Sequence, residues 1–301
     1  MGAATVTARE ATDRYPTRTG TAATTMPRHD PVVYPSGGGP LDGAQMHAFD
    51  GDGFLAVECL ITAAEVELLR DEVERLAADP GLAGDERVIR EPDSDEVRSV
   101  FEVHRLSEVM AHVIADERVA GMARQILGSD VYVHQSRVNR KPGFVGREFY
   151  WHSDFETWHA EDGMPAARAV SVSIALTPNY DCNGSLMVIP GSHRTFVATV
   201  GETPPDHYRH SLRRQEVGVP DHGALTRLTE DAGRIVTVTG GAGSAVMFDC
   251  NLMHGSAGNI SPYPRTNLFV VYNSVENELV EPFAADRPRP DFVASRHVVS
   301  L

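Results

Sequence analysis

The sequence of 301 residues is poor in cysteine and has no long apolar run. Its three cysteines, Cys59, Cys182 and Cys250, are odd in number and form no C-x-x-C pair, so they predict a reducing compartment without a disulfide framework. No apolar stretch reaches the roughly 18 residues that a membrane helix needs. The N-terminus also lacks the apolar centre of a signal peptide. These absences predict a soluble cytoplasmic protein without a membrane role.

Positive charge is also scarce. The chain has 27 Lys and Arg against 42 Asp and Glu, which gives a formal net charge of −15. This balance argues against nucleic acid as a partner, and we interpret the acidity as a contribution to solubility. With 42% hydrophobic residues, the chain can bury a large core.

Residues 1–40 are rich in Thr, Ala, Arg, Pro and Gly and have no apolar periodicity. The run GGGP at 37–40 ends this segment as a linker would. We therefore expect residues 1–40 to form a mobile or extended arm that can lie on the body. Residues 41–301 are expected to form a single domain.

The first half of this domain carries helix signals. Thr62 and Glu65 form a capping box, and apolar residues follow at helical spacing. A second helical stretch is expected over 107–127, with Asp116 as an internal N-cap and Gly128 as its end. Residues 80–98 are acidic and polar and predict a loop. The run Phe49–Val57 predicts a short strand entry with a turn at Asp50 and Gly51.

From residue 130 the apolar period changes to two. The predicted strands are short, β-branched and separated by Gly, Pro and Asn turns; they span 130–139, 168–177, 185–189, 234–239, 244–249 and 266–275. The simplest architecture is mainly β, a jelly roll (double-stranded β-helix) supported by N-terminal helices. Residues 200–232 interrupt the strands as a charged insertion, and a lid or an ordinary solvated loop would both fit it.

The stretch Phe149–Pro165 reads FYWHSDFETWHAEDGMP and contains His152-Ser153-Asp154. In an extended strand, residues two apart project to the same face, so His152 and Asp154 would point to one spot. His254, which follows an apolar strand, is the candidate third ligand. Two imidazoles and one carboxylate form a facial set that holds Fe(II) and leaves positions open.

Arg265 enters the apolar strand Thr266–Val271. A guanidinium that faces the interior of a sandwich is costly unless it pairs with an anion, and a carboxylate suits its bidentate geometry. If no internal Asp or Glu serves as the partner, a ligand carboxylate would. A place on the strand surface is the alternative for Arg265.

Together, the H-x-D, the distal His and the following Arg resemble the Fe(II)/2-oxoglutarate-dependent dioxygenases. The run NGSLMVIPGSHR (183–194) is similar to the phytanoyl-CoA dioxygenase-like group, in which His193 is expected to be structural rather than a metal ligand. The central run of seventeen residues resembles the ectoine hydroxylases more closely. The further segments that carry this resemblance are QSRVN (135–139), KPGF (141–144), DRYPTRTG (13–20), PRHDPVVY (27–34) and PRTNLFVVYNSVEN (264–277).

The resemblance implies roles for individual residues. His152, Asp154 and His254 match iron ligands, and Lys141 and Arg265 match the basic residues that hold 2-oxoglutarate. Gln135 and Trp158 match positions that contact ectoine, and Phe248 and Phe269 would be aromatic walls of the same pocket. Arg140 departs from the bulkier or aromatic residue expected before the Lys. A homodimer is implied as well.

The resemblance thus implies hydroxylation of ectoine to 5-hydroxyectoine with Fe(II), 2-oxoglutarate and O₂, releasing succinate and CO₂, as part of osmotic and heat stress protection. A second hypothesis keeps this chemistry for another small amino or imino acid, such as proline, or for a lipid acyl thioester. The acidic balance argues against a thioester of coenzyme A, whose phosphates need a basic entrance. A third is a metal-binding jelly roll without turnover, acting as a sensor or a structural module.

Overall fold

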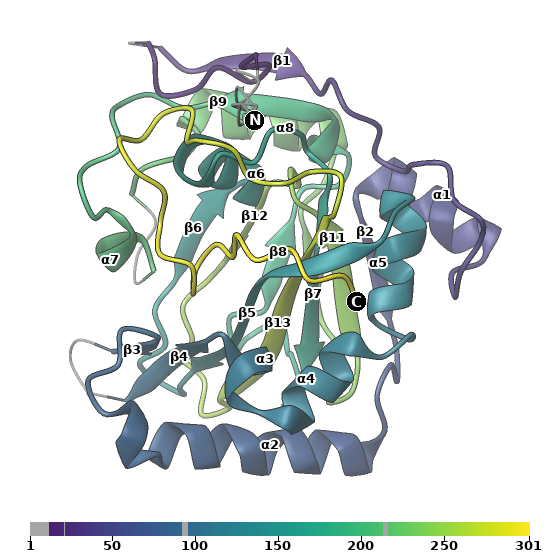
Figure 1. The fold of residues 1–301 in the computed structure, drawn as a ribbon, viewed down its shortest axis with the longest axis vertical. Coiled ribbons are helices and arrows are strands. Elements are labelled where there is room, and N and C mark those ends of the chain that lie inside the picture. Colours follow the sequence, from purple (N-terminus) through teal and green to yellow (C-terminus); the bar gives the residue numbers. More distant parts are fainter. Residues whose placement is uncertain (1–11, 21, 92–95, 213–215) are drawn as a thin grey trace, which may run out of the picture.

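The structure is a computed structural model that describes residues 12–20, 22–91, 96–212 and 216–301. Two antiparallel sheets face each other, and helices cover the outer side of the larger sheet (Figure 1). This is the jelly roll that the strand pattern predicted. In the described parts of the chain, no helix combines the length and the apolar character needed to cross a bilayer.

The larger sheet has seven strands in the order β2-β11-β7-β13-β5-β4-β3. In that order they span Phe54–Val57, Ala245–Asp249, Ala169–Ala175, Arg265–Ser274, Val131–Lys141, Val97–Phe101 and Val88–Arg90. The longest ladder joins β13 to β5 and places Arg265 opposite Lys141. Two basic residues far apart in the sequence therefore become neighbours at one end of this ladder.

The smaller sheet has the order β10-β8-β12-β6, and a two-stranded sheet joins β1 to β9. These strands span Val236–Val238, Leu186–Val188, His254–Ser256, Phe149–His152, Thr24–Pro27 and Thr195–Ala198, respectively. Strand β1 belongs to the predicted arm, which runs along the upper edge of the molecule (Figure 1). The described part of the arm is thus extended and paired, whereas residues 1–11 and 21 lie outside the description. The division of the chain at residue 40 stays a prediction.

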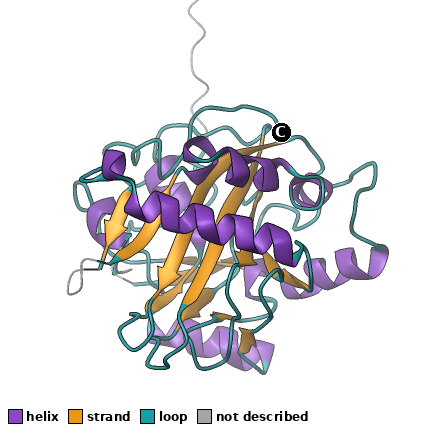
Figure 2. Cartoon of the chain, turned by 90° about the horizontal axis from the view of Figure 1, so that it is seen from below, coloured by secondary structure: helices purple, strands orange, loops and turns teal. Residues whose placement is uncertain are grey.

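Helices from the first half of the chain pack on the outer face of the larger sheet; α2 crosses its strands (Figure 2). Its N-cap is Thr62, and the predicted capping box with Glu65 is present. The helices are α1 (Gly43–Asp52), α2 (Ala63–Ala78), α3 (Val103–Leu106), α4 (Glu108–Ala115), α5 (Ala120–Leu127), α6 (Asp154–Thr157), α7 (Tyr208–Ser211) and α8 (His222–Ala232). Two 3₁₀ turns, η1 (Pro80–Leu82) and η3 (Ser192–Arg194), and a π-helical turn, η2 (Trp158–Asp162), complete the helical elements of the described residues.

The two faces of the larger sheet differ in chemistry because side chains alternate along a strand. On β13, Leu268 and Val270 belong to the hydrophobic core that packs against the helices. Their neighbours Arg265 and Phe269 line a cavity on the other side of the sheet. The face that packs against the helices therefore stabilises the fold, while the opposite face, which lines the cavity, contains polar side chains.

All six predicted strands are present within one or two residues of their expected bounds. Four local predictions are wrong. Asp50 and Gly51 do not form a turn before a strand; they lie in the last helical turn of α1, and Gly53 caps this helix in a left-handed conformation. Residues 80–98 are not only a loop, since they contain η1, β3 and the start of β4. Residues 200–232 interrupt the strands between β9 and β10 as predicted, but they contain α7 and α8 and are not an ordinary loop; residues 213–215 lie outside the description.

The fourth correction concerns the helical stretch 107–127, which consists of α4 and α5 with a break at Asp116. The side chain of Asp116 does not cap α5; its Oδ1 accepts from the backbone nitrogen of Arg118. Gly128 ends α5 in a left-handed conformation, as predicted.

Candidate active site

His152, Asp154 and His254 converge at one place between the sheets. His152 is the last residue of β6, and His254, the first residue of β12, lies opposite it in the ladder. The expectation of one continuous strand through the H-x-D is wrong, because Asp154 begins α6. Ser153 caps this helix by accepting from the backbone nitrogen of Glu156 at 3.3 Å. The change from strand to helix turns the Asp154 carboxylate back toward the two imidazoles.

The distances between the three side chains suit a shared metal ion. Nε2 of His152 lies 3.5 Å from Oδ1 of Asp154, and Nε2 of His254 lies 3.9 Å from the same oxygen. One ligand atom from each residue lies within 4.8 Å of the others. A first-row metal with bonds of about 2.0–2.2 Å accepts ligand atoms about 3–4 Å apart. Two His and one Asp match the donors of non-haem Fe(II) centres.

Both imidazoles are oriented by backbone carbonyls. Nδ1 of His152 donates to the carbonyl of Tyr150 at 2.7 Å, and Nδ1 of His254 donates to the carbonyl of Leu252 at 3.0 Å. Such bonds leave Nε2 of each ring free to bind a metal. Burial, together with the neighbouring His152, lowers the pKa of His254 to about 4, so this ring is neutral at pH 7. Burial opposes ionisation of Asp154, but the two imidazoles still lower its pKa. His254 and Asp154 are therefore in the protonation states that bind a metal.

Two buried basic side chains lie beside this centre. Arg265 is 4% exposed, and in the described part of the chain it makes no ion pair and its Nη1 has no hydrogen-bond partner. Burial, followed by the repulsion of Arg98, lowers its pKa to about 10. An uncompensated buried guanidinium is costly. Among the described residues no carboxylate pairs with Arg265, which is the condition under which the sequence predicted a ligand carboxylate as its partner.

Lys141, the only lysine of the chain, is the second basic residue. Its Nζ donates to Oγ of Ser256 at 2.9 Å and to the carbonyl of Ala257 at 2.6 Å. Burial and the nearby Arg265 and Arg98 lower its pKa to about 6. Two adjacent basic groups that have no carboxylate partner in the described part of the chain form a site that favours an anion.

The predicted substrate residues do not all reach the same cavity. Phe269 lines it together with Arg137, Lys141 and Arg265. Phe248 is 1% exposed and packs beside the His254 ring, with the centroids 5.0 Å apart.

Trp158, at the start of η2, is 4% exposed and packs edge-on against His134 at 5.0 Å. Gln135 is buried, and its amide nitrogen donates to the carbonyl of Val293 at 2.6 Å. Contacts of Gln135, Trp158, Phe248 and Phe269 with a substrate stay predictions.

Sequence reasoning missed Arg137. Its guanidinium lies over the rings of Phe101 and Phe269, at 5.7 and 5.1 Å from their centroids, and donates to Oε1 of Gln135. The signal was present, because β5 carries polar Gln135, Arg137, Asn139 and Lys141 at period two. Four such residues on one face of a strand within an apolar sheet indicate a polar cavity. Arg140, the residue that departs from the expected pattern, instead pairs with Glu74 at 3.1 Å.

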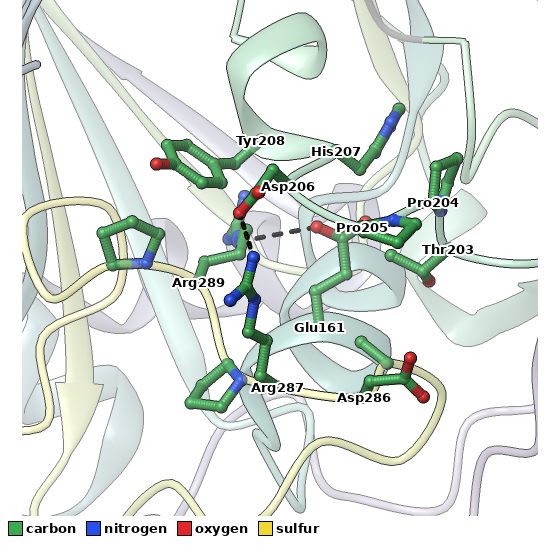
Figure 3. Close-up of a pocket in the computed structure, with 13 residues that line it drawn as sticks. Glu161, Thr203, Pro204, Pro205, Asp206, His207, Tyr208, Asp286, Arg287 and Arg289 are labelled. Carbon is green, nitrogen blue, oxygen red and sulfur yellow. Dashed lines mark hydrogen bonds and ion pairs between the residues drawn. The ribbon is translucent and has the colours of Figure 1, made fainter.

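A second cavity, of about 620 Å³, lies between the segment 203–208 and the segment 285–290 (Figure 3). Asp206 and Arg287 form an ion pair across it at 2.5 Å. Glu161, from η2, forms part of its wall, and its Oε2 lies 3.8 Å from Nε of Arg289. The segment 203–208 belongs to the insertion for which a lid was considered, and its ion pair with Arg287 joins it to the C-terminal segment.

Several known proteins are similar to this chain in sequence and in fold. Residues 49–267 match the phytanoyl-CoA dioxygenase (PhyH) family. The chain is 60% identical over 289 residues to the ectoine dioxygenase of Nocardia farcinica, a match that covers 96% of this chain and 95% of that protein. Among solved structures, EctD from S. alaskensis with 2-oxoglutarate and 5-hydroxyectoine is similar with a TM-score of 0.85 at 49% identity, covering 94% of this chain and 95% of that one. EctD from S. alaskensis with bound Fe has a TM-score of 0.85 at 48% identity and 95% coverage of each chain. The chain therefore belongs to the phytanoyl-CoA dioxygenase family and groups within it with the ectoine dioxygenases.

Proposed function

We propose that the protein hydroxylates ectoine to 5-hydroxyectoine in an Fe(II)- and 2-oxoglutarate-dependent reaction. The observation that carries this proposal is the convergence of His152, Asp154 and His254 beside a buried arginine, Arg265, that has no carboxylate partner among the residues the structure describes. The similarity to ectoine dioxygenases over nearly the full chain supports the substrate. When bound, iron with 2-oxoglutarate and O₂ supplies the oxidising chemistry, in which 2-oxoglutarate becomes succinate and CO₂ while the substrate gains a hydroxyl group.

The protein's own residues supply position and charge. His152, Asp154 and His254 would hold the iron and, as a set of three ligands, would leave coordination positions open for the cosubstrate. Arg265 and Lys141 would pair with a carboxylate of 2-oxoglutarate, which compensates their buried charge.

Ectoine is a small cyclic amidine with a carboxylate. A delocalised cation on an indole face gains about 0.5–2 kcal/mol, a role we assign to Trp158. Gln135, Phe248 and Phe269 would form the rest of the substrate pocket.

The direct test is turnover by the purified protein. We expect consumption of 2-oxoglutarate to require both iron and ectoine, and mass spectrometry to detect hydroxyectoine. Proline in place of ectoine is the control for substrate choice, and faster turnover of proline would select the alternative substrate class. Under anaerobic conditions, a visible charge-transfer band on adding Fe(II) and 2-oxoglutarate separates an enzyme from a metal-binding module. Absence of both band and product would refute the proposal.

The lowered pKa of Lys141 predicts that binding of 2-oxoglutarate takes up a proton. At pH 8 the amine is mostly neutral in the ligand-free protein, since its pKa is about 6. A bound carboxylate favours the ammonium form and raises this pKa, so up to about one proton is taken up per site. Affinity should therefore fall as the pH rises above about 6.

Because Lys141 is the only lysine, NMR of protein labelled with ¹³C-lysine follows this titration without overlap. We expect a pKa near 6 in the free protein and a higher value with 2-oxoglutarate. The Lys141→Arg variant controls for proton uptake by other groups. A free-state pKa near 10, or one that the ligand does not move, would contradict the assignment of Lys141.

We further propose a cytoplasmic homodimer. The three free thiols support a reducing compartment, and the resemblance to ectoine hydroxylases supports the dimer. Light scattering coupled to gel filtration measures the mass directly, and a species at 32.7 kDa, the mass of one chain, would contradict the dimer.

A further inference from the structure

We propose that Arg18, from the N-terminal arm, is a positioning residue that holds the Trp158 wall of the substrate pocket. It does so by clamping Glu156 and Glu161, which lie on either side of Trp158 in the sequence. This inference rests on the proposed function, because it assigns Arg18 to the binding of ectoine through Trp158. It also has a consequence for the protein without substrate, namely that Arg18 fixes the conformation around Trp158.

Arg18 reaches the interior from an extended segment. Its backbone has a φ of 57°, in the left-handed region that non-glycine residues rarely adopt. The side chain is 1% exposed. Nε and Nη2 donate to the two oxygens of Glu156 at 3.1 and 2.9 Å, and Nη1 donates to Oε1 of Glu161 at 2.6 Å. The planar guanidinium of Arg18 thus binds the carboxylate of Glu156 through two parallel hydrogen bonds and the carboxylate of Glu161 through a third. A lysine ammonium cannot reproduce this geometry.

The clamped segment contains α6 and the π-helical turn η2. A π turn is a rare conformation that occurs frequently at functional sites and needs support from its surroundings. Glu156 lies in α6 before this turn, and Glu161 lies inside it. By joining the two carboxylates, Arg18 links both ends of the backbone that presents Trp158. Asp154 is held separately, by the hydroxyl of Ser171, which donates to its Oδ2 at 3.3 Å, and by the neighbouring imidazoles, so the clamp acts on Trp158 more than on the metal ligands.

The guanidinium of Arg18 also contacts the segment 203–208, which lines the second cavity. Nη1 of Arg18 donates to Oγ1 of Thr203 at 2.6 Å, and this hydroxyl donates to the carbonyl of Ala284 at 2.8 Å. Thr203 and Glu161 both line the cavity (Figure 3). Arg18 therefore connects the arm, the turn that carries Trp158 and the segment 203–208 through one network of hydrogen bonds.

The test compares Arg18→Lys with the parent enzyme and with Arg14→Ala. Arg14 is a matched control because it lies in the same arm but pairs with Asp30 and has a side chain that is 47% exposed. We expect Arg18→Lys to raise the KM for ectoine by about 2-fold to 30-fold, which is the range that corresponds to loss of the contact with the indole of Trp158. The kcat at saturating ectoine and the Fe(II)–2-oxoglutarate absorption band should stay near those of the parent. Arg14→Ala should leave all of these quantities unchanged.

A ligand-free measurement separates this inference from the proposed function. Trp151 and Trp158 are the two tryptophans, so Trp151→Phe leaves Trp158 as the sole emitter. In that background, Arg18→Lys should increase quenching of Trp158 by acrylamide, since the clamp no longer holds the turn. If the parent does not hydroxylate ectoine, the proposed function fails, and the quenching experiment still decides whether Arg18 positions Trp158.

Should Arg18→Lys fail to fold, Glu161→Ala removes one arm of the clamp and keeps the ion pair between Arg18 and Glu156. It should raise the KM for ectoine and the quenching of Trp158 in the same direction. Folded variants with lower thermal stability but an unchanged KM and unchanged quenching would mean that Arg18 only stabilises the fold, and would overturn the inference.

Discussion

Asp154→Ala is expected to abolish hydroxylation of ectoine, lowering kcat/KM by about 1,000-fold or more. The carboxylate supplies the only negative charge among the three converging ligands. Loss of metal-based stabilisation of several kcal/mol corresponds to a factor of this size. The measurement is the rate of hydroxyectoine formation, together with the iron retained after gel filtration.

Asp181→Ala is the control for this experiment, because Asp181 is an exposed aspartate outside the site. It should keep both iron and activity. If Asp154→Ala retained full activity, Asp154 would be removed from the metal site, and the ligand set would have to be sought elsewhere.

Arg265→Leu is expected to raise the KM for 2-oxoglutarate by about 10-fold to 100-fold. A hydrogen bond to a charged group is worth about 1.5–3 kcal/mol, and each 1.4 kcal/mol is about a factor of ten. The same substitution is not expected to lower the stability of the ligand-free protein. Arg265 is buried without an ion-pair partner in the described residues, so its removal relieves a desolvation cost. The midpoint of thermal unfolding of the ligand-free protein should be unchanged or higher.

Arg140→Leu is the matched control, since Arg140 also lines the cavity but pairs with Glu74 near the surface. It should leave the KM for 2-oxoglutarate nearly unchanged. An Arg265→Leu variant with an unchanged KM for 2-oxoglutarate would show that this arginine does not anchor it. A variant that is clearly less stable would show that the guanidinium has a partner inside the protein.

The candidate site could be predicted from the sequence where each residue carried its own local signal. His152 and Asp154 stand two residues apart in a distinctive run, and Arg265 enters an apolar strand as a lone charge. Arg137 and Ser256 carried weaker signals. The guanidinium of Arg137 packs on the rings of Phe101 and Phe269, and the hydroxyl of Ser256 accepts a hydrogen bond from Lys141. Neither contact follows from spacing along the chain.

Short strands were harder to predict than long ones. Strand β12 has three residues and β6 has four, which is too few to show a period of two. They are strands because β8 and β6 pair with β12 on its two sides. The conformation of Asp154 is a similar case, because the cap by Ser153 converts the end of a strand into the start of a helix.

By itself, the sequence determined the elements whose causes are local. Alternating apolar residues specified β5, β7, β11 and β13 of the larger sheet, and the hydroxyl and carboxylate of Thr62 and Glu65 specified the start of α2. The tertiary structure alone decided which polar groups meet. Arg18 and Glu156 are 138 residues apart, and their buried ion pair exists only because β1 and β9 bring the arm onto the body. Local periodicity reports how a segment folds, whereas the pairing of buried charges depends on which segments pack together.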